Sequence, residues 1–243
     1  MMSIFASAAV LLSALAVMTD AHVSFRFPCP RRGPYWECPQ PGPNEWNLVD
    51  YDVRSPAGTH GTIVSPICKH PSSFAGTRPT FQAGQTVAAQ MDVGAYHMGG
   101  SCQWALSYDN GANWVVFQDY FQSCLSNATQ GTTFTLPFKI PADAPSGDAI
   151  VNWIWNNNEG NRELYSSCSD VVIQGTNGGS LSGVKPLFAN YGPNSPFIQE
   201  KALANGNWGK AFFDARPPIT ITVPKVSKRE LMRRLVNRIT NSD

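Results

Sequence analysis

The sequence predicts an all-β fold, namely an immunoglobulin-like antiparallel β-sandwich with long decorating loops and a short C-terminal helix. Two observations predict it. Runs of β-branched and aromatic residues, each short enough for a single strand, recur from residue 86 onward. Turn-forming residues separate these runs, and such a pattern favours two sheets packed around one core. The expected strands cover residues 86–93, 102–109, 114–120, 132–140, 148–156, 169–174 and 219–223.

Residues 1–21 are the first expected element, a signal peptide. Their apolar run, residues 4–18, is too short to span a membrane comfortably and begins too early for a core helix. The small residues Thr19 and Ala21 stand where a signal peptidase inspects the chain, so we expect cleavage after Ala21. Cleavage makes His22 the first residue of a secreted, extracellular protein.

The mature chain is expected to begin with an irregular loop. Six prolines lie within residues 28–43, and this density excludes a central strand or a helix interior. Farther along, an Asp-Asn-Gly turn at residues 109–111 tolerates positive φ between two expected strands, which predicts a hairpin. Trp153 and Trp155 lie two apart in another expected strand, so both should face the core.

Residues 22–224 are expected to form one domain, followed by a basic amphipathic tail at residues 225–243. The tail carries six basic side chains against two acidic ones, and a capping-box pattern at Ser227 to Glu230 predicts a short helix. This helix is expected to dock on the domain or to fray in solvent, and binding to an anionic surface is the alternative. The rest of the chain lacks the basic surface of a nucleic-acid-binding protein. No later apolar run reaches membrane length, so we expect no membrane anchor. The protein is also expected to be a monomer.

The six cysteines all lie in the mature chain, and this even number predicts three disulfides formed in an oxidising compartment. The expected pairs are Cys68–Cys168, Cys102–Cys124 and Cys29–Cys38, and the last two are favoured because they close short loops. Asn127-Ala128-Thr129 is a sequon for N-glycosylation, which is consistent with secretion.

Four histidines are the candidate metal ligands, namely His22, His60, His70 and His97. His22 differs from the others because cleavage gives it a free α-amine beside its imidazole, and the two groups can chelate a metal together. A second imidazole completes a planar set of three nitrogens, which selects copper(II) over zinc, calcium or magnesium. His97, between an expected strand and a glycine turn, is modestly favoured as that second ligand, while His60 and His70 remain open.

Several ordered motifs between residues 95 and 175 resemble a known family. They are Ala95-Tyr-His97-Met-Gly-Gly-Ser-Cys102-Gln103, Leu106-Ser-Tyr-Asp109, Pro141-Ala-Asp-Ala-Pro145-Ser-Gly147-Asp148-Ala149, Trp153-Ile-Trp155-Asn156 and Gly160-Asn161-Arg162-Glu163-Leu164-Tyr165. Together with the terminal His22, these motifs resemble the fungal chitin-active lytic polysaccharide monooxygenases of auxiliary-activity family eleven.

The resemblance implies that copper is the cofactor and that His22 and His97 hold it, with the phenol of Tyr165 as a distant axial group. It also implies that Glu163 is a carboxylate near the oxygen site. Residues two apart on a strand point to the same side, so the spacing of Glu163 and Tyr165 is compatible with a shared site.

The function that the resemblance implies is oxidative cleavage of glycosidic bonds in crystalline or cell-wall polysaccharide. Chitin is the first expected substrate, and cellulose or another β-glucan is the second. An external electron donor and dioxygen or hydrogen peroxide are the further partners. Two alternatives stay open: a non-catalytic copper-binding protein with the same ligands, and a carbohydrate-binding module, which would not need His22 at its N-terminus. The pair Glu163 and Tyr165 favours the enzyme.

Overall fold

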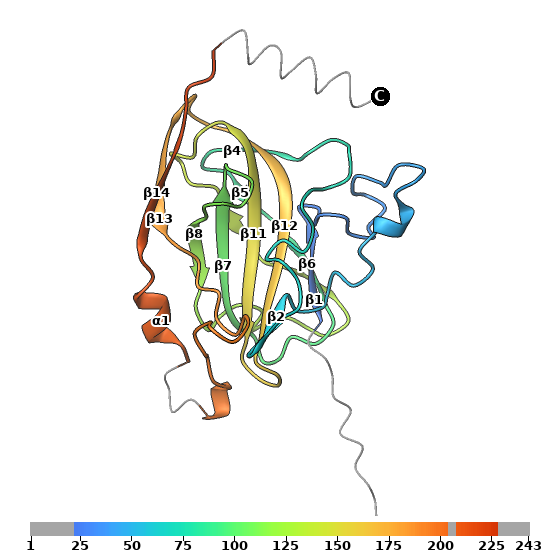
Figure 1. Cartoon of the computed structure of the whole chain (residues 1–243), viewed down its shortest axis with the longest axis vertical. Coiled ribbons are helices and arrows are strands. Elements are labelled where there is room, and N and C mark those ends of the chain that lie inside the picture. The colour runs from blue at the N-terminus through green and yellow to red at the C-terminus, as the bar shows by residue number, and fades with distance from the viewer. Residues whose placement is uncertain (1–21, 204–207, 228–243) are drawn as a thin grey trace, which may run out of the picture.

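The computed structural model describes residues 22–203 and 208–227, and it has the expected architecture of an antiparallel β-sandwich (Figure 1). The large sheet has the spatial order β14 (Pro218–Val223), β13 (Gly179–Val184), β8 (Val115–Tyr120), β7 (Gly100–Ser107), β11 (Gly147–Asn157), β12 (Glu163–Gln174), β2 (Gly58–Thr59) and β3 (Thr62–Ile63). The opposite layer consists of two short ladders, β1 (Val23–Phe27) with β6 (Gln90–Val93) and β9 (Thr133–Thr135), and β5 (Thr86–Val87) with β10 (Phe138–Lys139). The predicted fold class is therefore confirmed.

The core lies between the two layers, because each layer turns one face of alternating side chains inward. Val23 and Phe25 of β1 and Met91 of β6 are buried against the large sheet. Trp153 and Trp155 of β11 are fully buried in the same cluster, and their rings stack with centroids 5.8 Å apart. Their expected core position is confirmed.

Two expected strands are each divided between the short ladders. Residues 86–93 form β5 and β6, and residues 132–140 form β9 and β10. Pro137 separates β9 from β10, and because proline has no N–H for a ladder, the chain changes partners there. The strand expected at residues 169–174 begins earlier, so that β12 also includes Glu163 and Tyr165.

The sequence does not predict the remaining elements. These are β1, β2, β3 and β13, the parallel strand β4 (Thr80–Gln82) beside β12, the 3-10 turns η1 (Trp46–Leu48) and η2 (Lys201–Leu203), and the helix α1 (Lys210–Asp214). None of the helices in the described residues is long and apolar enough to cross a membrane. The expected signal peptide and the helix expected after Ser227 lie outside the described residues.

The three expected disulfides are present: Cys29–Cys38, Cys68–Cys168 and Cys102–Cys124. The Asp-Asn-Gly hairpin is present as well, with positive φ at Asn110 and Gly111 between β7 and β8. Both predictions are confirmed.

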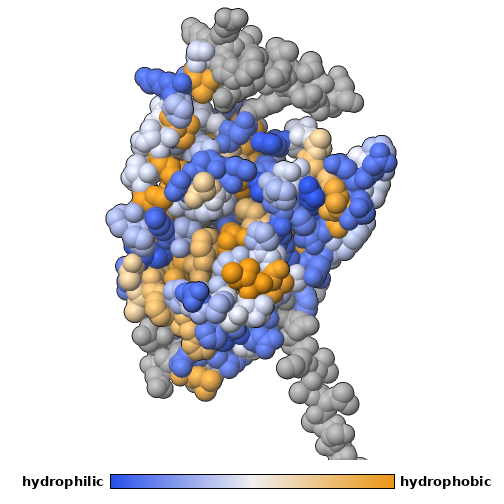
Figure 2. Space-filling model, viewed as in Figure 1, coloured by the Kyte–Doolittle hydropathy of each residue, from blue (hydrophilic) through white to orange (hydrophobic). Residues whose placement is uncertain are grey.

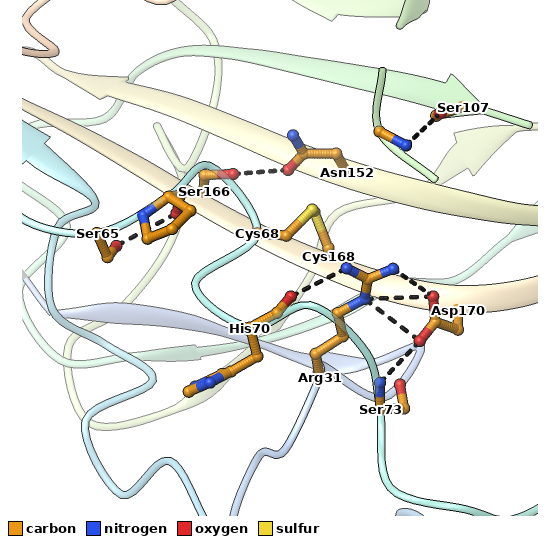
Figure 3. Close-up of a disulfide and its surroundings, with 12 residues drawn as sticks. Arg31, Ser65, Cys68, His70, Ser73, Ser107, Asn152, Ser166, Cys168 and Asp170 are labelled. Atoms are coloured by element: carbon orange, nitrogen blue, oxygen red, sulfur yellow. Dashed lines mark hydrogen bonds and ion pairs between the residues drawn. A yellow bond between two sulfur atoms is a disulfide. The ribbon is translucent and has the colours of Figure 1, made fainter. Parts of the chain in front are cut away.

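The loops between β1 and β2 have a mostly hydrophilic surface (Figure 2), and cross-links fix them and the loop between β3 and β4 to the sandwich. Arg31 forms a buried ion pair with Asp170 of β12, with Nη2 and Oδ1 2.7 Å apart. Its Nη1 also donates to the carbonyl oxygen of His70, and the amide of Ser73 donates to Asp170. This network lies beside the Cys68–Cys168 disulfide (Figure 3), so one stretch of β12 anchors the whole region.

Candidate functional site

The turn that presents His97 has an unusual backbone. Four consecutive residues have positive φ: His97 (44°), Met98 (53°), Gly99 (81°) and Gly100 (134°). Left-handed geometry costs a residue with a side chain roughly 1–2 kcal/mol, so His97 and Met98 need outside contacts to hold it.

Hydrogen bonds from other elements supply those contacts to the three carbonyl groups after His97. The side-chain amide of Asn158 donates to Met98 at 3.0 Å, and the indole N–H of Trp155 donates to Gly99 at 3.1 Å. The backbone N–H of Cys124 donates to Gly100 at 3.0 Å. The strained turn is therefore held by the end of β11, the hairpin after it and the disulfide-bonded loop after β8.

The imidazole of His97 has one ring nitrogen available for a ligand. Its Nε2 is buried and has no hydrogen-bond partner within the described residues. The opposite side of the ring lies against the β11–β12 hairpin, where a Cβ on Gly160 would come 2.8 Å from Nδ1. A buried basic nitrogen without a partner is costly for a protein to keep, unless a bound group occupies it.

The charge state of His97 suits a ligand. Burial lowers the pKa of its imidazole below the ordinary value, and the charges of Arg162 and His22 lower it further, whereas Glu159 raises it through its backbone and its carboxylate. The ring is therefore neutral at neutral pH, with a lone pair on a ring nitrogen.

His22 lies next to the segment that leads to His97. It precedes β1, where Gly94 donates a hydrogen bond from its N–H to the His22 carbonyl at 2.5 Å, and the His22 N–H donates to Ala95 at 3.4 Å. A Cβ on Gly94 would lie 2.8 Å from Cβ of His22, so only glycine permits this approach. The backbone of His22 is therefore bonded to Gly94 and Ala95, and Ala95 lies two residues before His97.

Glu163 and Tyr165 form a buried pair on the same face of β12. The Tyr165 hydroxyl donates to Oε2 of Glu163 at 2.8 Å, and both side chains are almost fully buried. The Tyr165 ring packs on Trp155 with centroids 4.7 Å apart, and Trp155 in turn holds the His97 turn through Gly99. The carboxylate–phenol pair and His97 are thus connected through one indole ring.

The other two histidines have different surroundings. His70 is hydrogen-bonded to Asp50, with Nε2 and Oδ2 2.9 Å apart. His60 is exposed and packs against the ring of Phe197 with centroids 4.3 Å apart. Within the described residues, no group of three or more His, Cys, Asp or Glu side chains could hold a metal ion. A metal at His22 and His97 therefore needs a further donor of another kind, such as an α-amine.

Sequence reasoning missed the residues that position the candidate ligands, namely Gly94, Trp155, Asn158 and Gly160. The hairpin after β11 is held rigidly, because Asn157 donates to the carbonyls of Glu159 and Asn161 and Arg162 donates to those of Asn157 and Gly160. The sequence does contain one signal for this hairpin, namely three consecutive asparagines at the end of an expected strand, residues 156–158.

The β-sandwich thus holds His22 near the turn of His97, and Trp155 connects that turn with the buried Glu163–Tyr165 pair. No family model matches the chain. It is 37% identical over 165 residues to AA11 family lytic polysaccharide monooxygenase A of Aspergillus fumigatus, covering 67% of this chain and 69% of that protein. The chain belongs to the AA11 family of lytic polysaccharide monooxygenases, which are oxidoreductases, and the resemblance seen in the sequence is confirmed.

Two further similarities are more limited. The chain is 29% identical over 111 residues to an AA11 family lytic polysaccharide monooxygenase of Aspergillus oryzae, covering 40% of this chain but only 26% of that protein. Among solved structures, a cellulose-active polysaccharide monooxygenase from M. thermophila is 14% identical with a TM-score of 0.39, covering 66% of this chain and 78% of the other.

Proposed function

We propose that the mature protein begins at His22, is secreted, and uses copper to cleave glycosidic bonds of crystalline or cell-wall polysaccharide oxidatively. Chitin is the proposed first substrate, and cellulose or another β-glucan is the second. Membership of the AA11 family supports the reaction class. The observation that carries the metal site is the buried Nε2 of His97, which has no hydrogen-bond partner in the described part of the chain, while the backbone of His22 is bonded to Gly94 and Ala95 just before it.

The donor set fits copper. The amine and imidazole of His22 and the Nε2 of His97 would hold the ion through three nitrogens, and the Tyr165 phenol would be a further, weaker oxygen donor. Nitrogen donors in a tetragonal arrangement suit copper(II) better than the hard oxygen-preferring cations. When bound, copper supplies one-electron chemistry toward dioxygen or hydrogen peroxide, with electrons from an external donor.

The residues of the chain control protons and geometry around that site. Glu163 accepts the Tyr165 hydroxyl at Oε2, and a carboxylate positioned in this way can take up or release a proton during turnover. Their burial excludes bulk water, which strengthens this hydrogen bond. The contacts of Trp155, Asn158 and Gly160 keep His97 in a single orientation, so its ring need not be reordered during turnover.

The metal site is tested by comparing the protein that begins at His22 with a form carrying one extra N-terminal residue and with His97→Ala. We expect tight binding of one copper(II) in the first and a large loss in both others, measured by calorimetry and by electron paramagnetic resonance. Equal affinity in all three would show that the ligands are wrong and would return attention to His60 and His70.

A non-catalytic copper carrier is the second candidate, and Glu163→Gln separates it from the enzyme. The substitution keeps the size of the side chain, so copper affinity should stay near that of the wild type. Turnover on the true glycan should fall by roughly 10²-fold, because a positioned acid or base contributes at least that much. Tyr165→Phe should act more mildly, and Glu45→Gln in the loops before β2 is the control. A carrier yields no oxidised oligosaccharide from chitin, cellulose or fungal cell wall, with copper bound and reductant present.

A further inference from the structure

The loop between β8 and β9, residues 121–132, borders both candidate ligand segments. Near its start, the backbone N–H of Cys124 donates to Gly100, the last residue of the strained His97 turn. Gly99 of the same turn packs so closely on this loop that a Cβ there would lie 3.4 Å from the Cα of Ser126. The first half of the loop therefore lies against the turn that carries His97.

The end of the same loop lies beside the segment that contacts His22. The N–H of Gly131 donates to Val93 at 2.7 Å, and the N–H of Val93 donates back to Thr132 at 2.9 Å. The next residue, Gly94, donates to the His22 carbonyl. The loop thus runs beside residues 93–100, the segment that contacts His22 and carries His97, so its middle lies near the candidate copper site.

Asn127 lies in that middle part and is exposed. Ala128 is buried in the core cluster, which anchors the loop and leaves its two neighbours, Asn127 and Thr129, on the surface. Within the described residues the Asn127 side chain takes part in no hydrogen bond, and it begins the only Asn-X-Ser/Thr sequon in the sequence. An exposed, unengaged asparagine in a surface loop is a good acceptor for N-linked glycan.

We propose that Asn127 carries an N-linked glycan at the rim of the candidate copper site, and that this glycan selects between polymers by their shape. A glycan is bulky and strongly hydrated, so it cannot be compressed between the protein and a flat crystalline surface. A single soluble chain can approach beside it. This inference rests on the proposed function, because it needs passage through the secretory pathway and a polysaccharide substrate.

The test uses the full chain with its signal peptide, secreted from a filamentous fungus. Asn127→Gln and Thr129→Ala each destroy the sequon by a different residue, whereas Thr129→Ser keeps it and is the matched control. Intact mass before and after enzymatic deglycosylation shows whether the glycan is present, and copper affinity shows whether the metal site is intact. Adsorption is measured on crystalline chitin, and binding is measured with soluble chito-oligosaccharides.

We expect glycan on the wild type and on Thr129→Ser, and none on the other two variants. Loss of the glycan should strengthen adsorption to crystalline chitin by about tenfold, equivalent to about 1.4 kcal/mol. Binding of soluble oligosaccharides and of copper should stay unchanged.

Each other outcome counts against a defined part of the inference. An unmodified wild type overturns it entirely. A glycan whose removal leaves adsorption to crystalline chitin unchanged, or weakens it, overturns the role in selection. If every form binds copper but none adsorbs to chitin, cellulose or cell wall, the proposed substrate fails and the selection role fails with it, while the mass still decides whether Asn127 is modified.

Discussion

The two candidate ligands reach the same site by opposite structural routes. His22 extends the straight strand β1, and the register of the β1–β6 ladder, with Val23 opposite Val93, places it beside Gly94. His97 lies on a turn of four positive-φ residues that hydrogen bonds from distant elements hold in place. One ligand is therefore positioned by secondary structure, and the other by tertiary contacts against local strain, so the two should fail under different substitutions.

Asp170→Asn should have the largest effect on stability. Asp170 lies outside the segments that carry His22 and His97, so this variant shows how a general loss of stability affects the copper site. It leaves the buried Arg31 charge without its partner, and such losses cost about 3–5 kcal/mol of unfolding free energy. Urea denaturation measures the loss. The copper spectrum of the remaining folded protein should be unchanged. Glu37→Gln is the control, because it breaks the partly exposed ion pair with Arg26 and should change the unfolding free energy little.

The carboxylate of Asp170 also makes the free energy of unfolding depend on pH, and the direction of its pKa shift gives the sign of that dependence. Burial alone raises the pKa of Asp170, but the Arg31 guanidinium and the Ser73 amide outweigh it, so the pKa lies below its ordinary value. A carboxylate with a lowered folded-state pKa contributes stability above its unfolded pKa of about 3.9, and that contribution is lost as the pH falls through the folded pKa. Denaturation midpoints should therefore fall more steeply on acidification below about pH 5 in the wild type than in Asp170→Asn.

Trp155→Phe should have the next largest effect, and it strikes the His97 side alone. It removes the donor to the buried Gly99 carbonyl and leaves a cavity, with a cost of about 2–3 kcal/mol. Trp153→Phe is the matched control, because that indole donates to the sulfur of Cys102 rather than to a carbonyl of the turn. Both variants should lose stability, but only Trp155→Phe should alter the copper spectrum. Equal spectra would show that the indole does not position His97.

Gly160→Ala should cost less stability and should shift the metal site directly. A side chain at its φ of +81° costs roughly 1–2 kcal/mol, and its Cβ would meet the His97 ring. Gly61→Ala, at φ +95° with nothing within 4 Å, carries the same strain without the contact. We expect copper affinity to fall about tenfold in Gly160→Ala only. A similar fall in Gly61→Ala would mean that strain, rather than contact, is responsible.

Gly94→Ala should have the smallest effect on stability, within about 1 kcal/mol, because only His22, the residue ahead of β1, must move. Its Cβ would press on the carbonyl and Cβ of His22, so the α-amine should be displaced and copper affinity should fall. Calorimetry measures both quantities, with Gly42→Ala, which meets only the flexible Glu45 side chain, as control. Unchanged affinity would show that the N-terminal segment adjusts freely.

The sequence predicts this molecule well where local patterns decide the structure. Alternating apolar residues and turn residues marked most strands of the sandwich, and cysteine spacing marked two short disulfide loops. It fails where distant contacts override local preference. His97 and Met98 adopt positive φ against their own tendency, because Trp155 and Asn158 hold their turn. The parallel pairing of Thr80 beside Val172 leaves no local trace either, since it joins segments far apart in the chain.

The long strand β12 carries Glu163 and Tyr165 at its start, and its edges also affect how the protein behaves in solution. One edge pairs with β11 along nearly its whole length, but the other is covered only near its ends, by β2 at Glu163 and Leu164 and by β4 from Val172. Between them, the N–H of Arg31 bonds to the Cys168 carbonyl, and the disulfide to Cys168 ties the loop that holds Cys68 to this part of the strand. An uncovered strand edge is a template for aggregation. Reduction of this one bond should thus promote edge-to-edge assembly between molecules, so an oxidising environment protects the protein's solubility as well as its fold.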